Sequence, residues 1–207
     1  MKTKALLPIL VIIFWVVCFG FATSNFNHLT LESERKALIV EKKPQLSLEV
    51  IDDNDHASTL SKIAINQQKV VVAQFMYTSC RTLCSTLGNQ FQQSQRHIID
   101  KGLENKIHLA SISFDVDRDS AHRLKKYREL MRADDKVWSL ATLKTGNDLK
   151  LAKEQFGLII VPSQSLDIVH NSAFLVIASD GRLVGIFNDD DIQGALALAV
   201  TQLQLEA

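Results

Sequence analysis

The sequence has little of what marks a disordered or a strongly charged protein. It holds only three prolines and eight glycines in 207 residues, which argues against low-complexity or disordered content. Lysine plus arginine equals aspartate plus glutamate at 23 each, so no charge excess suggests binding to nucleic acid or to an anionic surface. Hydrophobic residues make up 46% of the chain, which is ordinary globular composition with room for one domain and a small accessory segment.

Cysteine is scarce as well, with three in the chain. Cys18 lies inside an apolar run and is expected to act there as a small hydrophobic residue. Cys80 and Cys84 are four positions apart, and a disulfide between them would stabilise little, because the stabilisation grows with the length of the loop that is closed. The pair is therefore predicted to have a chemical rather than a structural role.

Long apolar runs are absent except near the N-terminus. Residues Ala5–Ala22 carry no charge and would span about 27 Å as a helix, close to the thickness of a bilayer's hydrocarbon core. Lys2 and Lys4 favour a cytoplasmic N-terminus, which places the chain after Asn25 on the outer, periplasmic side. A cleaved signal peptide is the alternative. We expect an uncleaved anchor, because the run exceeds a usual signal-peptide core, and both interpretations predict an exported domain.

The remaining pattern predicts one α/β domain. Apolar, β-branched runs at Val70–Met76 and Ile107–Phe114 are typical of strands covered on both faces, and an amphipathic helical pattern follows each. A third strand, a short helix, a hairpin over residues 173–187 and a closing helix come next. This order predicts a thioredoxin-like central mixed sheet flanked by helices, parallel first and antiparallel at its end. The predicted division is residues 1–24 as the N-terminal transmembrane anchor or signal peptide, 25–45 as a polar tether and 46–207 as the domain.

The two nearby cysteines occupy the expected ligand side of such a sheet, the carboxyl ends of its parallel strands. Cys80 and Cys84 follow the first buried strand there, and an i, i+4 pair at a helix start places both sulfurs on one face. A helix N-terminus stabilises thiolate, and Arg81 adds a positive charge. Thiolates suit Cu(I) or zinc, and two of them leave a metal site incomplete.

Six histidines compete for the missing position. His170 immediately precedes the first hairpin strand, and the antiparallel direction of that strand would place its start on the cysteine side. His97 and His108 would each lie about 20 Å away, one along the same helix and the other at the far end of a strand. The remaining three are expected to be solvated: His28, His56 and His122. Elimination and topology together predict His170 as the third ligand.

Asp115 is the other candidate at this side of the sheet. It ends the second buried strand. Its carboxylate is expected either to orient a ligand and tune thiolate basicity, or to cap the turn that follows, together with Asp117 and Asp119.

Three segments resemble the Sco/SenC family, in order and with compatible gaps from about Leu46 to Asn188. Residues 75–84, FMYTSCRTLC, are similar to the family motif Y-T-x-C-P-x-x-C-P. Residues 113–119, SFDVDRD, resemble the segment S-V-D-P-x-R-D. Residues 169–184, which begin with Val169-His170-Asn171-Ser172 and include DGRLV, resemble the D-H-S strand and the D-x-x-G-x-x-V turn.

The resemblance implies a thioredoxin-fold copper protein that helps to assemble the binuclear copper centre of cytochrome c oxidase. In this family copper is bound by both motif cysteines and by the histidine, here Cys80, Cys84 and His170. Members also act as thiol reductants toward the cysteines of the oxidase subunit. The implied partners are the copper-bearing subunit of the oxidase or another exported cuproprotein, a copper donor, and the membrane through the N-terminal helix.

The sequence departs from the family pattern next to the predicted ligands. Arg81 and Ser85 replace the prolines that flank the motif, Thr82 replaces a frequent aspartate, and Val116 replaces the proline after Asp115. The ligating atoms are retained. These changes bear on the rigidity of the helix start and on redox potential, and they leave open a divergent paralogue with another client.

A thiol–disulfide oxidoreductase acting on an exported client is the main alternative. Thioredoxin-type reductases use C-x-x-C and a cis-proline before the hairpin strand. Here three residues separate Cys80 from Cys84, and Asn171-Ser172 precede that strand. A peroxiredoxin-like peroxidase is a weaker alternative, because no separate resolving cysteine exists outside the motif. The pattern favours a metal-binding assembly protein over a turnover enzyme.

Overall fold

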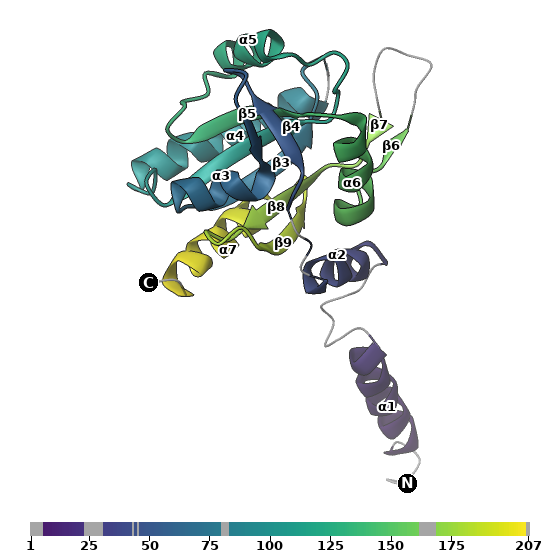
Figure 1. The fold of residues 1–207 in the computed structure, drawn as a ribbon. Helices are drawn as coiled ribbons and strands as arrows, with labels where there is room; N and C mark the ends of the chain where they lie inside the picture. The colour runs from purple at the N-terminus through teal and green to yellow at the C-terminus, as the bar shows by residue number, and fades with distance from the viewer. Residues whose placement is uncertain are drawn as a thin grey trace.

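The computed structural model describes residues 6–22, 31–42, 44, 46–79, 83–161 and 169–205. Figure 1 shows a central sheet with helices on both of its faces. The strands are β1 (Glu49–Asp52), β2 (Ala57–Thr59), β3 (Val70–Met76), β4 (Ile107–Ser113), β5 (Trp138–Leu143), β6 (Ile160–Val161), β7 (Val169–His170), β8 (Ala173–Ile177) and β9 (Leu183–Asn188). The helices are α1 (Leu6–Ala22), α2 (Leu31–Glu41), α3 (Leu60–Gln67), α4 (Leu83–Asp100), α5 (Ala121–Met131), α6 (Gly146–Phe156) and α7 (Ile192–Leu205).

The sheet is mixed, as the sequence predicts. Its strand order is β2-β1-β5-β4-β3-β8-β9. The three central strands β3, β4 and β5 are parallel, and β8 and β9 add an antiparallel hairpin at one side. At the other side β1 pairs antiparallel with β5, and the short β2 forms the edge. All seven residues of β3 and all seven of β4 are buried, because helices cover both faces of the sheet there.

Aromatic contacts show which helix covers which face. Phe91 of α4 stacks on Phe174 of β8 and meets Trp138 of β5 edge-on, so α4 lies on the face of the sheet that bears these side chains. Phe75 of β3 points the opposite way and contacts Phe156 of α6. Helix α4 is therefore packed on one face of the sheet through contacts with β5 and β8, and α6 lies on the other face.

Helices α4 and α5 pack closely where α4 carries a glycine. A Cβ atom at Gly88 would lie 2.8 Å from the sulfur of Met131 and 2.9 Å from the hydroxyl of Tyr127. The absence of a side chain at Gly88 is thus what allows α5 to approach α4 so closely.

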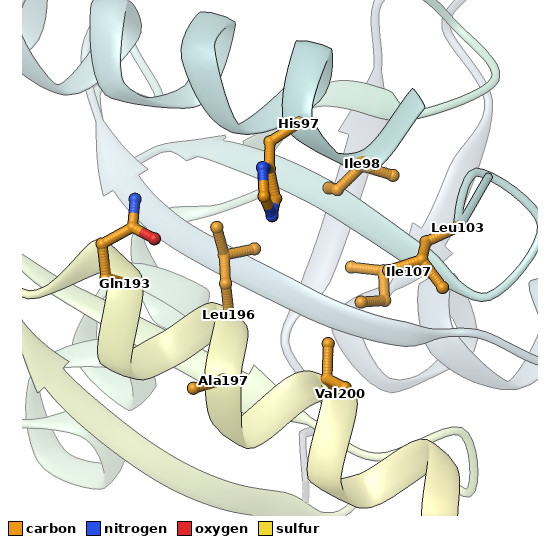
Figure 2. Close-up of a pocket in the computed structure, with 8 residues that line it drawn as sticks. All are labelled: His97, Ile98, Leu103, Ile107, Gln193, Leu196, Ala197 and Val200. Atoms are coloured by element: carbon orange, nitrogen blue, oxygen red, sulfur yellow. The ribbon is translucent and has the colours of Figure 1, made fainter. Parts of the chain in front are cut away.

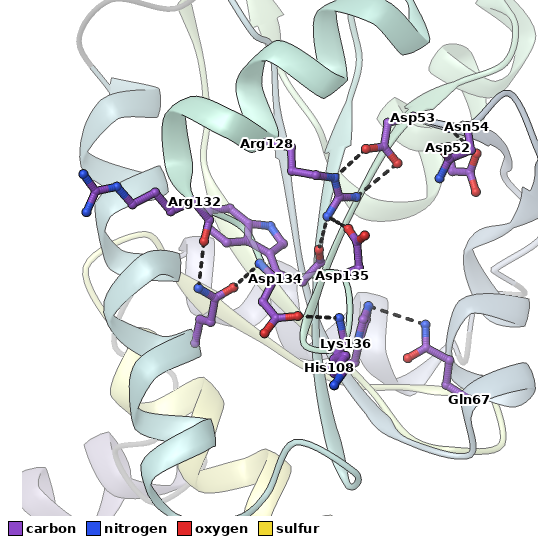
Figure 3. Close-up of polar contacts among 12 residues, drawn as sticks. Asp52, Asp53, Asn54, Gln67, His108, Arg128, Arg132, Asp134, Asp135 and Lys136 are labelled. Carbon is purple, nitrogen blue, oxygen red and sulfur yellow. Dashed lines mark hydrogen bonds and ion pairs between the residues drawn. The ribbon is translucent and has the colours of Figure 1, made fainter.

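Arg128, whose side chain is 17% exposed, fixes α5 against the sheet (Figure 3). Its guanidinium donates to both carboxylate oxygens of Asp53, at 2.5 and 3.0 Å, and to the carbonyl oxygen of Trp138 at 3.2 Å. Asp135 forms an ion pair with the same group. Because Asp53 lies in the turn between β1 and β2, one arginine ties together α5, β5 and the edge hairpin.

The segment predicted as a tether, residues 25–45, contains helix α2, and α2 packs on β9. Lys36 is buried and its ammonium group donates to the side chain of Asn188. Arg35 donates to the carbonyl oxygen of Gly157 at 3.3 Å. Residues 31–41 are therefore part of the packed domain.

Helix α1 carries the apolar run of the N-terminus. Its side chains from Leu10 to Val17 are all exposed. Lys2 and Lys4, on which the predicted orientation of the anchor depends, lie outside the described residues. Within the described part of the chain, no helix combines the length and the apolar character needed to cross a membrane.

Candidate metal centre

His170 lies against the carboxyl ends of the two central strands. It belongs to β7, which pairs antiparallel with β6 through His170 and Ile160. Its ring centroid is 4.8 Å from that of Phe114, directly after β4, and 5.8 Å from that of Tyr77, directly after β3. The histidine therefore sits at the end of the sheet where the segment that carries Cys80 begins.

The hydrogen bonding of His170 leaves one ring nitrogen available. Nδ1 lies 2.9 Å from the carbonyl oxygen of Asn171, and since a carbonyl oxygen only accepts, Nδ1–H is the donor. In the neutral ring Nε2 then carries a lone pair. That atom is buried and has no hydrogen-bond partner among the described residues.

Burial also keeps this ring neutral. It lowers the pKa of His170, and this effect is larger than the opposing effects of the Asn171 hydrogen bond and of the charge of Asp189. A buried, unprotonated imidazole nitrogen without a partner costs free energy in an apolar setting. It is the arrangement expected of a side chain that donates its lone pair to a metal ion.

The cysteines are placed only in part. Helix α4 begins at Leu83, so the backbone of Cys84 lies in its first turn, where unpaired N–H groups favour a thiolate. Cys80 lies outside the described residues, as do Arg81 and Thr82. Among the side chains that are described, no three of the His, Cys, Asp and Glu type gather closely enough to hold a metal ion. The three-ligand site thus stays a prediction.

Asp115 organises the turn after β4. Its carboxylate accepts from Arg118 Nε at 2.5 Å, its N–H donates to Ser113 Oγ at 3.1 Å, and its carbonyl oxygen accepts from the N–H of Asp119 at 2.9 Å. These contacts join the turn to the last residue of β4, and the carboxylate itself is bound by the side chain of Arg118. A role for Asp115 in orienting a metal ligand stays a prediction.

Asp119 has a wider role than the turn capping that the sequence suggested for it. It is 2% exposed. Its carboxylate accepts from the N–H of Thr78 at 2.7 Å, from the hydroxyl of Thr78 at 2.5 Å and from the hydroxyl of Ser113 at 2.6 Å. The carboxylate therefore joins the segment two residues before Cys80 to the end of β4. The available signal was its place as the last residue of the segment SFDVDRD.

A groove of about 190 Å³ elsewhere in the domain is not this centre (Figure 2). It lies between α4 and α7, beside Ile107 at the start of β4, at the end of the parallel strands opposite His170. Its lining is mainly apolar, and His97 is its one titratable side chain among the residues drawn in Figure 2. The prediction that His97 is remote from the cysteine segment agrees with this position.

Three parallel central strands, a helix with a cysteine in its first turn after the first of them, and an antiparallel hairpin at the side of the sheet define a thioredoxin-like fold. The family is also clear. The chain belongs to the SCO1/SenC family, whose model matches residues 48–204.

Solved structures show the same fold. A SCO1/SenC family lipoprotein from Bacillus anthracis is similar with a TM-score of 0.66 and 20% identity, over 81% of this chain and 99% of that one. ScoI of Arabidopsis thaliana, with copper bound, gives a TM-score of 0.64 and 14% identity over 76% of this chain and 96% of its own. Yeast Sco1, with copper bound, gives a TM-score of 0.60 and 18% identity over 75% of this chain and 87% of its own. No curated protein is a match by sequence.

Proposed function

We propose that this chain is an exported, membrane-anchored copper-binding protein that assists assembly of the copper centre of cytochrome c oxidase. Copper is its cargo, held by Cys80, Cys84 and His170. The observation that carries the proposal is the buried, unpartnered Nε2 of His170 at the sheet end where the cysteine segment begins. Thiolate sulfur is a soft donor that suits Cu(I), and an imidazole nitrogen completes a three-coordinate set.

The proteins of similar fold support this assignment. The ScoI and yeast Sco1 structures hold copper, and BsSco is described as a member of the Sco family of cytochrome c oxidase assembly proteins. Export and anchoring rest on the sequence: Lys2 and Lys4 precede the apolar run, and the side chains of α1 from Leu10 to Val17 are all exposed. Fractionation of cells tests them, and full-length protein recovered in the cytosol would contradict them.

The test of the site is an anaerobic Cu(I) titration of the reduced full chain in a mild detergent, with a competing chelator. One Cu(I) per chain is expected. Cys80→Ser and Cys84→Ser should each abolish tight binding, because one thiolate and one imidazole hold Cu(I) poorly against competing thiols. His170→Ala should weaken binding strongly. His122→Ala, an exposed histidine on α5, is the matched control and should bind normally. Unchanged affinity in His170→Ala, with folding confirmed, rules out the three-ligand site.

A thiol–disulfide oxidoreductase is the second candidate. The placement of Cys84 in the first turn of α4 favours it, because a helix N-terminus lowers the pKa of a thiol there. BsSco, similar in fold with a TM-score of 0.62 and 17% identity, is described as having a disulfide switch. In this case His170→Ala would slow reduction of a model disulfide client and leave Cu(I) affinity nearly intact.

A further inference from the structure

A hollow lies directly beside the segment that leads to Cys80. It measures about 220 Å³ and is lined on one side by Thr78 and Ser79. The other side belongs to α5, which contributes Arg123, Lys126 and Tyr127, with Leu130 at the end of the lining. Any molecule seated here touches the residues next to the first predicted copper ligand.

The α5 side of this hollow is basic, although the whole chain has no net charge. Lys126 is exposed and has no carboxylate partner among the described residues. Arg123 donates to the carbonyl oxygen of Arg118 at 3.2 Å and lies 3.8 Å from a carboxylate oxygen of Asp119, and its own side chain is 45% exposed. By contrast, Arg118 in the neighbouring turn is held by Asp115 at 2.5 Å. The positive charge of the hollow is therefore available to an incoming group.

An apolar side chain continues the same stripe of the helix. Leu130 follows Lys126 by four residues and Arg123 by seven, so the three side chains project from one face of α5. Leu130 is 72% exposed. Because Leu130 also lines the hollow, a partner seated there would bury apolar surface next to Arg123 and Lys126.

Acidic residues follow strand β9, beside His170 of the candidate metal centre, and form an acidic flank of that centre. Asp189 lies close enough to act on the ring of His170, and Asp190 and Asp191 follow it, both exposed. An anionic bilayer laid over this end of the sheet would be repelled by that flank. A protein surface can match the basic and the acidic flank at once, which also orients it over the centre.

We infer that the stripe Arg123, Lys126 and Leu130 is a docking surface for an acidic segment of a protein partner, which it brings against the Cys80 segment. This rests on the proposed function, because the partner would be the donor or the acceptor of the copper. Attraction between opposite charges mainly accelerates encounter and selects the partner, and Leu130 adds apolar contact.

The test uses two labelled peptides with one apolar residue each, one rich in Glu and the other rich in Lys. Neither peptide contains cysteine, so the measurement reports binding without disulfide formation or metal transfer. Fluorescence anisotropy with the metal-free full chain in detergent should show about tenfold tighter binding of the acidic peptide at low salt. The difference should shrink as salt rises and the Debye length falls. Lys126→Glu should remove the preference, and Leu130→Ser should weaken binding of the acidic peptide.

Lys153→Glu is the matched control, since Lys153 is an exposed lysine on α6, the helix on the other face of the sheet. It should leave both affinities unchanged. Equal binding of the two peptides, or an equal loss in Lys153→Glu, overturns the inference. A further result would also overturn it: the full chain binds phosphatidylserine vesicles tightly, and Lys126→Glu abolishes that binding but leaves the binding of the acidic peptide unaffected. A separate Cu(I) titration of Lys126→Glu should match that of the unmodified chain. A failed titration of the unmodified chain refutes the proposed function alone.

Discussion

Acid is expected to destabilise this protein through His108. The side chain is 1% exposed at the start of β4, and Gln67 lies 3.4 Å away, with its amide Nε2 facing the ring Nε2 (Figure 3). Burial, and next the positive charge of Lys69, lower the pKa of His108 from 6.5 to about 3, against a smaller opposing effect of the Lys136 main chain. Protonation would add a charge without access to water and would set an N–H against the amide of Gln67.

The sign and size of the effect follow from linkage. In the unfolded chain His108 takes up a proton near pH 6.5, whereas in the folded chain it resists protonation until about pH 3. The contribution of the neutral ring to stability is therefore complete above pH 6.5 and is lost as the pH falls toward 3. Each pKa unit corresponds to about 1.4 kcal/mol, so the loss at pH 4 is about 3 kcal/mol. That is a large share of the total stability of a typical domain, about 5–15 kcal/mol.

Urea unfolding at a series of pH values between 7 and 4 measures this loss. The decisive quantity is the difference in unfolding free energy between the unmodified chain and His108→Gln, because carboxylates titrate in both and cancel. The Gln variant is expected to start less stable at pH 7 and to gain about 3 kcal/mol relative to the unmodified chain by pH 4. His122→Gln, at an exposed position, controls for loss of a histidine as such. Parallel curves for His108→Gln and the unmodified chain would refute the reasoning.

Two further substitutions test the packing around the candidate centre. Asp119→Ala should lower the free energy of unfolding by about 2–4 kcal/mol, because it leaves the N–H and hydroxyl of Thr78 and the hydroxyl of Ser113 without their acceptor. Chemical denaturation measures this loss. A loss below about 0.5 kcal/mol would mean that these groups find other partners. Gly88→Ala should cost about 1–3 kcal/mol in the same assay, because the added methyl group meets Met131 Sδ at 2.8 Å. In a double-mutant cycle with Met131→Ala, the double variant should lose less stability than the sum of the two single losses, and strict additivity would assign the cost of Gly88→Ala to Tyr127 or to another cause.

The central sheet was predictable because its evidence is local. Val70–Met76 is an apolar run interrupted only by Gln74, and the run and strand β3 coincide. The hairpin of β8 and β9 was likewise predictable, because both strands and the turn between them lie in one short segment of the sequence. The position of His170 followed from strand direction alone, because an antiparallel strand that ends far from the cysteines must begin near them.

The parts that were not predicted depend on distant partners or on very short elements. Strands β6 and β7 are two residues each, too short to show a period of two. Helix α3 has eight residues, and its clearest signal is the capping side chain of Thr59, which accepts from the N–H of Lys62. The carboxylate of Asp119 accepts a hydrogen bond from Thr78, which lies 41 residues earlier in the chain, so no local sequence pattern predicts this contact.

The packing of α2 on β9 limits how far the domain can stand from a membrane. A free segment over residues 25–45 would allow a separation of roughly 70 Å at full extension. With residues 31–41 held on the domain through Lys36, the stretch between α1 and α2 is residues 23–30. At full extension these eight residues reach about 28 Å. If α1 is embedded in a bilayer, the domain can stand no more than about 28 Å from the end of α1, and a client of the proposed function must present its copper ligands within that layer above the membrane surface.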